Sequence, residues 1–115
     1  RLKYRLREDG NVTIIDLSGK LMGGYDADVF RDLVYGLIED GRKQVIVNLA
    51  DVSWVNSTGV GILITGYTTL RKNRGDLKLL NVSNKIESIL YVTKLNLIFE
   101  CFDDERKAVT SFTSG

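Results

Sequence analysis

The sequence predicts a single α/β domain with a mixed, mostly parallel sheet of about five strands and about four helices. Its 115 residues are a length typical of one domain, so residues 1–115 are treated as a single unit. Two strand-like segments open the chain on either side of an Asp-Gly turn, which is the pattern of an antiparallel hairpin. After them, short apolar runs alternate with segments of helical periodicity, which indicates parallel strands joined by right-handed crossovers.

The predicted hairpin joins residues 2–7 to residues 12–17. Apolar residues alternate with Lys and Arg from Leu2 to Arg7, which predicts a strand with one solvent-exposed face. These charges suit an exposed sheet edge, where they discourage pairing with other chains, and a nucleic-acid contact is less favoured because no aromatic residues share their face. The second strand is apolar on both faces apart from Thr13 and Asp16, so we expect it deeper in the sheet.

A glycine-rich loop is predicted at residues 18–25, followed by a helix at residues 26–40. The spacing of the three glycines does not match a phosphate-binding P-loop, and we expect a turn with positive φ instead. Asp26 and Asp28 suit a cap and a first-turn acid better than an acid–base pair, and Gly41 ends the helix. The apolar face of this helix is formed by Phe30, Leu33, Val34, Leu37 and Ile38.

A β-branched run at residues 45–49 predicts a central strand covered on both faces, and a short polar loop follows it. A second helix then begins near Ser57 and Thr58 and ends at residues 71–74. We expect its three glycines to allow close packing on the sheet, although they weaken an isolated helix. Its apolar stripe consists of Val60, Leu63, Ile64, Tyr67 and Leu70, and its glycines are Gly59, Gly61 and Gly66.

The last third of the chain predicts two more strands, at residues 77–80 and 97–102, each followed by a helix. Ser83 or Asn84 caps the first of these helices, and Asp103 caps the second. Cys101 lies in the last strand, where we expect a buried small hydrophobic residue and not a reactive thiol. The inward residues are Ile86, Ile89 and Leu90 in the first helix and Ala108, Val109 and Phe112 in the second.

The composition excludes several classes of function. The chain contains no histidine, which removes Ser-His-Asp and Cys-His nucleophiles and histidine-bearing metal sites. A net charge of +1 implies no strongly charged partner such as nucleic acid. A single cysteine allows no disulfide within the chain, which fits a reducing compartment, and no apolar run reaches the roughly 20 residues that span a bilayer. We therefore expect a cytoplasmic protein without enzymatic activity, metal or cofactor.

The most informative stretch is the predicted start of the second helix, where Ser57 and Thr58 provide two hydroxyl groups. A helix start offers unpaired N–H groups and the positive end of the helix dipole, so Ser57 suits either an N-cap or a phosphate acceptor. A nucleophilic role is disfavoured because Lys20 is the only nearby basic loop residue. Gly59-Val60-Gly61 does not complete a dinucleotide fingerprint, since the later glycine and acid are not in place.

These residues carry a resemblance to a known family. The segment Asp51-x-Ser53-x-x-x-Ser57-Thr58-Gly59-x-Gly61-x-Leu63 resembles the signature of STAS domains, the sulfate-transporter and anti-sigma-factor-antagonist modules. The soluble bacterial antagonists match best, and the likeness extends over nearly the whole chain. It includes Leu17-x-Gly19-x-Leu21, Gly75 to Leu80, and Leu95-x-Leu97 to Phe99. The resemblance implies a STAS-like fold.

The resemblance also implies a function, namely an anti-sigma factor antagonist that regulates transcription by partner switching. Such a protein binds an anti-sigma factor that is also a serine kinase, is released on phosphorylation of a serine, here Ser57, and is reset by a PP2C-type phosphatase. Thr58 is a secondary acceptor candidate, and ATP is the cofactor of the kinase. The alternative is a non-switching STAS scaffold or sensory module, while a domain appended to a transporter is disfavoured because no membrane segment is present. The predicted partner-binding residues are Met22, Gly23, Gly24, Trp54, Asn56, Ser57, Thr58, Gly59 and Val60.

Two positions depart from the family pattern. The family often has Asp immediately before the phosphorylated serine, where this chain has Asn56, and often has Asp after the equivalent of Leu21, where this chain has Met22. Both departures remove negative charge near the site. Weaker repulsion should make a phosphate on Ser57 easier to hold.

Overall fold

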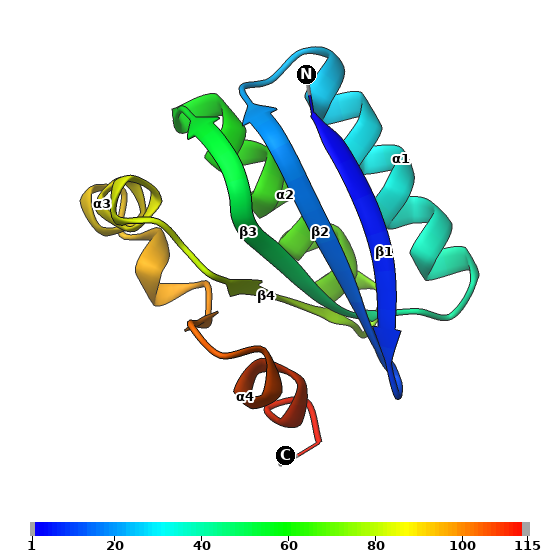
Figure 1. The fold of residues 1–115 in the computed structure, drawn as a ribbon. Helices are drawn as coiled ribbons and strands as arrows, with labels where there is room; N and C mark the ends of the chain where they lie inside the picture. Colours follow the sequence, from blue (N-terminus) through cyan, green and yellow to red (C-terminus); the bar gives the residue numbers. More distant parts are fainter. Residues whose placement is uncertain (1, 114–115) are drawn as a thin grey trace.

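A computed structural model describes residues 2–113 and confirms the predicted α/β architecture (Figure 1). The described chain forms a five-stranded sheet and four α-helices, with one additional 3₁₀ turn. In chain order the elements are β1 (Lys3–Asp9), β2 (Val12–Leu21), α1 (Tyr25–Glu39), β3 (Gln44–Val55), α2 (Ser57–Lys72), β4 (Asp76–Leu80), α3 (Asn84–Val92), η1 (Leu95–Leu97), β5 (Cys101–Phe102) and α4 (Glu105–Thr110). Among these residues no helix is long and apolar enough to cross a membrane.

The strands follow one another across the sheet in the order β1-β2-β3-β4-β5. β1 is antiparallel to β2, and every later pair is parallel, so the opening hairpin and the crossovers are confirmed. β1 forms an edge of the sheet, as its charges predicted. Its apolar face is less covered than the alternation predicted, since Tyr4 is 47% and Leu6 is 42% exposed. An edge strand has a neighbour on one side only, which explains this incomplete burial.

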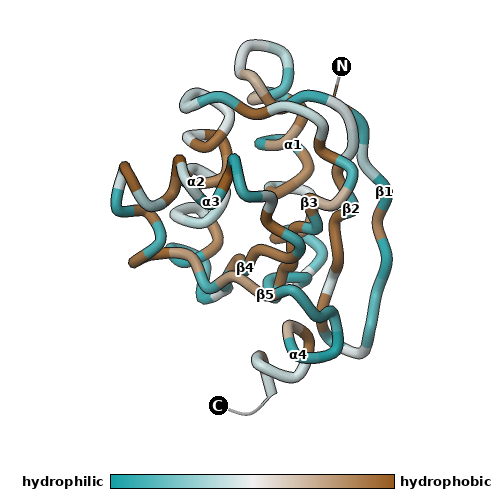
Figure 2. Tube along the Cα trace, turned by 60° about the vertical axis from the view of Figure 1, so that its left-hand side comes forward, coloured by the Kyte–Doolittle hydropathy of each residue, from teal (hydrophilic) through white to brown (hydrophobic). Residues whose placement is uncertain are grey.

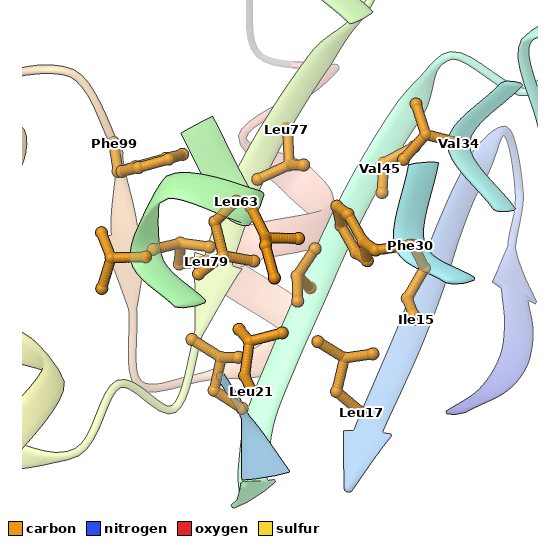
Figure 3. Close-up of a cluster of buried hydrophobic side chains, with 14 of the residues drawn as sticks. Ile15, Leu17, Leu21, Phe30, Val34, Val45, Leu63, Leu77, Leu79 and Phe99 are labelled. Carbon is orange, nitrogen blue, oxygen red and sulfur yellow. The ribbon is translucent and has the colours of Figure 1, made fainter. Parts of the chain in front are cut away.

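The two faces of the sheet are covered unequally. Ile15 and its alternating neighbours on β2 join a large apolar cluster with α1, α2 and α3, which Figure 3 shows around Phe30, Leu63 and Leu77. Ile14 faces the other way, into a small cluster closed by Ala108 and Val109 of α4. Figure 2 shows hydrophobic segments in β2, β3 and β4 and in the helices, and hydrophilic colour along much of β1.

β3 is much longer than predicted. It continues through residues 51–55, which we expected in a polar loop, and it pairs with β2 as far as Leu21↔Val55. The pairing is kept by register shifts between Asp16 and Ser18 and between Gly19 and Lys20, and Gly19 has φ 93°. Hydrogen bonding to a bulged β2 therefore outweighs the polar composition, and the predicted loop is reduced to Asn56.

The starts of α1 and α4 differ in detail from the prediction, whereas the start of α3 agrees with one of its two predicted caps. α1 follows Gly24 without a side-chain cap, and Asp26, predicted as a cap, accepts a hydrogen bond from the Met22 N–H at 3.1 Å instead. Ser83 caps α3, which decides between the two predicted candidates. Asp104, and not Asp103, caps α4 by accepting from the Lys107 N–H at 3.0 Å.

The predicted last strand is mostly irregular. The 3₁₀ turn η1 occupies its beginning, and β5 has only two residues. Cys101 is exposed, so the prediction that it is buried is wrong, because the short β5 lies at the second edge of the sheet. Partial desolvation and the nearby Glu87 raise the pKa of the Cys101 thiol, which does not favour a reactive thiolate.

Candidate functional site at the start of α2

The junction between β3 and α2 assigns different roles to two adjacent side chains. Asn56 has an extended backbone and is the N-cap of α2, because its Oδ1 accepts a hydrogen bond from the Gly59 N–H at 2.8 Å. Ser57 is the first helical residue, its side chain is exposed, and no hydrogen bond of its hydroxyl is found within residues 2–113. The interpretation of Ser57 as the N-cap is therefore wrong, and its hydroxyl is not committed to the helix.

The position of this helix start is fixed by close packing at Gly59. A Cβ atom at Gly59 would collide with the carbonyl oxygen of Leu21 and would lie 3.0 Å from Cγ2 of Val55. The first turn of α2 therefore lies directly on the ends of β2 and β3, and only glycine fits there. This explains one glycine of the motif in structural terms.

The loop between β2 and α1 lies against the same turn. Gly23 has φ 113°, and a Cβ there would lie 2.6 Å from Cγ2 of Thr58. The hydrogen bond from Met22 to Asp26 holds this loop at its other side. The structure therefore brings Met22 and Gly23 together with Ser57 and Thr58, as the family pattern implied.

Trp54 lies near the end of β3 and is 45% exposed. The ammonium group of Lys85, at the start of α3, lies 3.1 Å from the centroid of the indole ring. Lys20 of β2 is paired with Trp54 in the β2–β3 register. Our sequence reasoning missed Lys85. Since the carboxyl ends of adjacent parallel strands meet at one edge of a sheet, the placement of α3 directly after β4 was the signal that could have found it.

Not every predicted contact residue is accessible. Val60 is only 1% exposed and Gly59 is buried, so both belong to the core and offer no side-chain contact to a partner, contrary to the prediction. Met22, Gly24, Trp54, Ser57 and Thr58 are exposed. Tyr25, which the prediction did not include, is 59% exposed beside the same loop.

The electrostatics of the junction favour an added negative group. The first turn of α2 contains no acidic residue, so the positive end of its dipole is not offset locally. Asn caps a helix about as well as Asp but carries no charge, which means that Asn56 keeps the cap without repelling an anion on Ser57. The site therefore suits modification by a negative group at an exposed hydroxyl.

A groove of about 380 Å³ between α1 and α2 begins at Thr58 and contains Gly61 and Phe30 among its lining residues. It adjoins an exposed helix start and contains no cluster of titratable side chains. The candidate site is therefore an exposed helix start at the ends of β2 and β3 in a mostly parallel sheet. The family model described as "STAS domain" matches residues 3–108, and the chain belongs to this family.

Named relatives are consistent with this membership. The chain is 30% identical over 95 residues to the "Anti-sigma-B factor antagonist" of Bacillus subtilis (strain 168), covering 83% of this chain and 85% of that protein. Among solved structures, the anti-sigma factor antagonist SpoIIAA in its unphosphorylated form has a TM-score of 0.70 at 22% identity, covering 96% of this chain and 98% of SpoIIAA. The phosphorylated form of SpoIIAA from Bacillus has a TM-score of 0.74 at 21% identity, covering 96% and 99%.

A third structure extends the likeness beyond Bacillus. An anti-sigma factor antagonist from Mycobacterium paratuberculosis has a TM-score of 0.81 at 18% identity, covering 96% of this chain and 93% of that one. At these identities the structural likenesses concern the fold.

Proposed function

We propose that this chain is an anti-sigma factor antagonist that regulates bacterial transcription by partner switching in the cytoplasm. The unphosphorylated chain binds an anti-sigma factor that is also a serine kinase, and this binding frees the sigma factor. The kinase transfers the γ-phosphoryl group of ATP to the Ser57 hydroxyl, ADP and a proton leave, and the complex dissociates. A PP2C-type phosphatase hydrolyses the phosphoserine and restores the binding form. The chain itself supplies the acceptor hydroxyl and the contact surface, and performs no catalysis.

The observation that carries the proposal is the exposed Ser57 hydroxyl next to a different capping residue. Because Asn56 makes the capping bond to the Gly59 N–H, phosphorylation of Ser57 breaks no hydrogen bond of α2. A phosphate group adds roughly −1.5 to −2 charges, which the helix N-terminus stabilises. The fold is therefore expected to persist while the charge of the surface changes.

The surroundings of Ser57 explain how that charge would release a partner. Met22 is 42% exposed and Trp54 is 45% exposed, so a partner that covers the junction can bury apolar surface on both. The same coverage would remove water from a phosphate on Ser57. Burial of an unpaired charge costs several kcal/mol, and changing a two-state population from 1:99 to 99:1 requires about 5.5 kcal/mol. The free-energy cost of burying a phosphate group is therefore of the size that switching requires.

The acceptor is tested by incubating the chain with a candidate anti-sigma kinase and ATP and measuring the intact mass. We expect one added phosphate on the wild type and on Thr58→Ala, and none on Ser57→Ala. Thr58→Ala is the matched control because Thr58 is the adjacent exposed hydroxyl on the same helix turn. A phosphate that persists on Ser57→Ala and disappears on Thr58→Ala would assign the acceptor to Thr58.

The switch itself is tested by binding of the same kinase to Ser57→Asp, with Trp54→Ala as a test of the contact surface. We expect both variants to bind more weakly than the wild type. Tight binding that Ser57→Asp leaves unchanged, together with no phosphate on the wild type, would contradict switching and favour the constitutive scaffold.

A further inference from the structure

The three most exposed large apolar side chains of the described chain, Tyr91, Val92 and Leu97, lie in one short segment, which also contains the exposed Ile98. Tyr91 is 73%, Val92 79%, Leu97 79% and Ile98 42% exposed. We call these four residues the α3–η1 surface, since they lie at the end of α3 and in and after η1. Outside this segment no large apolar residue that the structure describes exceeds 59% exposure. A concentration of this kind marks an interaction surface, because isolated exposed apolar residues would be spread over the molecule.

The α3–η1 surface has a depression next to its projecting side chains. A groove of about 610 Å³ is lined by Leu90, Phe99 and Cys101 together with Tyr91 and Val92. Leu97 and Ile98 do not belong to this lining, although both of their chain neighbours, Asn96 and Phe99, do. One surface therefore offers both apolar side chains that project and a groove that apolar side chains can fill.

Charges of opposite sign flank the apolar centre. Glu87 lies four residues before Tyr91 and Lys94 lies three residues after it, and both side chains are exposed. Neither takes part in an ion pair within residues 2–113. The two charges lie on either side of Tyr91 in the chain, with Glu87 inside α3 and Lys94 just past its C-cap Thr93, in a left-handed backbone conformation (φ 62°).

We infer that the α3–η1 surface binds a second copy of this chain in a two-fold dimer. If two α3 helices pack antiparallel with Tyr91 near the axis, Glu87 of each copy meets Lys94 of the other, so both charge pairs form at once. The antiparallel helix dipoles are favourable in the same arrangement. A symmetric copy also supplies the apolar side chains that fill the groove, and it does so twice. This inference goes beyond the proposed switching function, because none of these residues belongs to the Ser57 junction.

The test is sedimentation velocity of the full chain from micromolar to millimolar concentration, combined with a charge-swap cycle. We expect a concentration-dependent dimer for the wild type. Glu87→Lys and Lys94→Glu should each weaken dimerisation by about tenfold, because two attractive pairs become two repulsive pairs. The double swap should restore it. Glu39→Lys is the matched control, since it makes the same change at an exposed position on α1.

Two further measurements make the result decisive. Val92→Asp should abolish the dimer without loss of thermal stability, because Val92 is 79% exposed in the single chain. Alkylation of Cys101, which lines the groove, should slow as the wild-type protein is concentrated and should not slow for Val92→Asp. A chain that stays monomeric at all concentrations, or a dimer unaffected by the charge changes at Glu87 and Lys94, would overturn the inference.

Discussion

Asn56 and Ser57 are adjacent in the chain, yet their side chains have different roles in the structure. Asn56 satisfies a backbone donor of α2, and Ser57 presents its hydroxyl to solvent. The replacement of a more usual Asp by Asn at position 56 is therefore mild for the helix, since both side chains provide a carbonyl or carboxylate oxygen as acceptor. It lowers the negative charge next to the proposed acceptor without removing the cap.

This division predicts unequal effects of two alanine substitutions. Asn56→Ala should lower the free energy of unfolding by about 1 kcal/mol, because the Gly59 N–H loses its acceptor. Ser57→Ala should change it by less than about 0.5 kcal/mol, as expected of an exposed side chain outside any hydrogen bond that the structure describes. Urea unfolding measures both, with Asn56→Asp as the variant that keeps the cap. An equally large loss in Ser57→Ala would mean that Ser57 has a structural role.

At this scale the sequence predicted a candidate site but did not predict the separate roles of its two residues. Asn and Ser are both good N-caps, so local chemistry could not choose between positions 56 and 57. The choice depends on where β3 ends, which is fixed by its pairing with β2 at Leu21↔Val55. Burial of Val60 follows from the same register, which is why its proposed role as a contact residue was wrong.

Among the elements, α2 is the one whose glycines are best explained by packing. Two of its glycines lie where a side chain would collide, Gly59 against Leu21 and Gly66 against Phe30, whose Cε2 would be 2.6 Å from a Cβ atom. A Cβ at Gly61 would meet no heavy atom within 4 Å. Close packing, which we expected of all three glycines, therefore explains Gly59 and Gly66 but not Gly61, which lines the groove beside α1.

Alanine substitutions at these glycines should therefore differ in sign. Gly61→Ala should raise the free energy of unfolding by about 0.5–1 kcal/mol, because alanine favours a helix interior and has room there. Gly59→Ala should lower the stability, since the new methyl group displaces the helix from the end of β2. Thermal or urea unfolding of the two variants provides the comparison. A stabilised Gly59→Ala protein would contradict the packing that positions the site.

The order of the elements could be predicted from periodicity alone, whereas their ends could not. Apolar runs such as residues 45–49 identify a buried strand because a continuous apolar composition indicates burial on both faces. Residues 51–55 are partly polar because this end of β3 is exposed at several positions, although its backbone is fully strand-like. Likewise, β5 is shorter than its apolar sequence indicates because only Cys101 and Phe102 pair with β4.

Across the whole molecule, a polar network on the α4 side of the sheet connects the two ends of the chain. Arg7 of β1 donates to both carboxylate oxygens of Asp16 at 2.6 and 3.0 Å, and to both of Glu105 in α4 at 3.1 and 2.8 Å. Asn48 of β3 also donates to Asp16 at 2.8 Å. Arg7 of β1 thus has a role within the folded chain, which sequence reasoning missed because residues 7 and 105 meet only in the folded chain.

This network predicts how stability depends on pH. Hydrogen bonds from Arg7, opposed by partial burial, lower the pKa of Asp16 from its ordinary value of 3.8 to about 2. Hydrogen bonds from Arg7 also lower the pKa of Glu105. Because the folded-state pKa is depressed, the unfolded chain takes up the proton first as the pH falls. The stabilisation is therefore complete above about pH 4 and is lost between about pH 4 and about pH 2.

Asp16→Asn should accordingly lower the free energy of unfolding by about 2 kcal/mol at neutral pH, and by much less near the acid end of this window. Urea unfolding of the variant and the wild type across the acid range measures the difference. Asp28→Asn is a suitable control, because Asp28 is exposed and its ion pair with Arg31 lies on the surface of α1. A constant difference at every pH would show that the charge of Asp16 is not responsible.

The single residue between β3 and α2 has one more consequence for the proposed phosphorylation. The backbone before Asn56 is held in the sheet and the backbone after it is helical, so Ser57 cannot be drawn out into an extended conformation without partial unfolding. A kinase that binds its substrates as extended peptides would find no such segment here. Selectivity for Ser57 would then depend on the shape of the folded domain, and an isolated peptide with the same residues would lack the features that define the substrate.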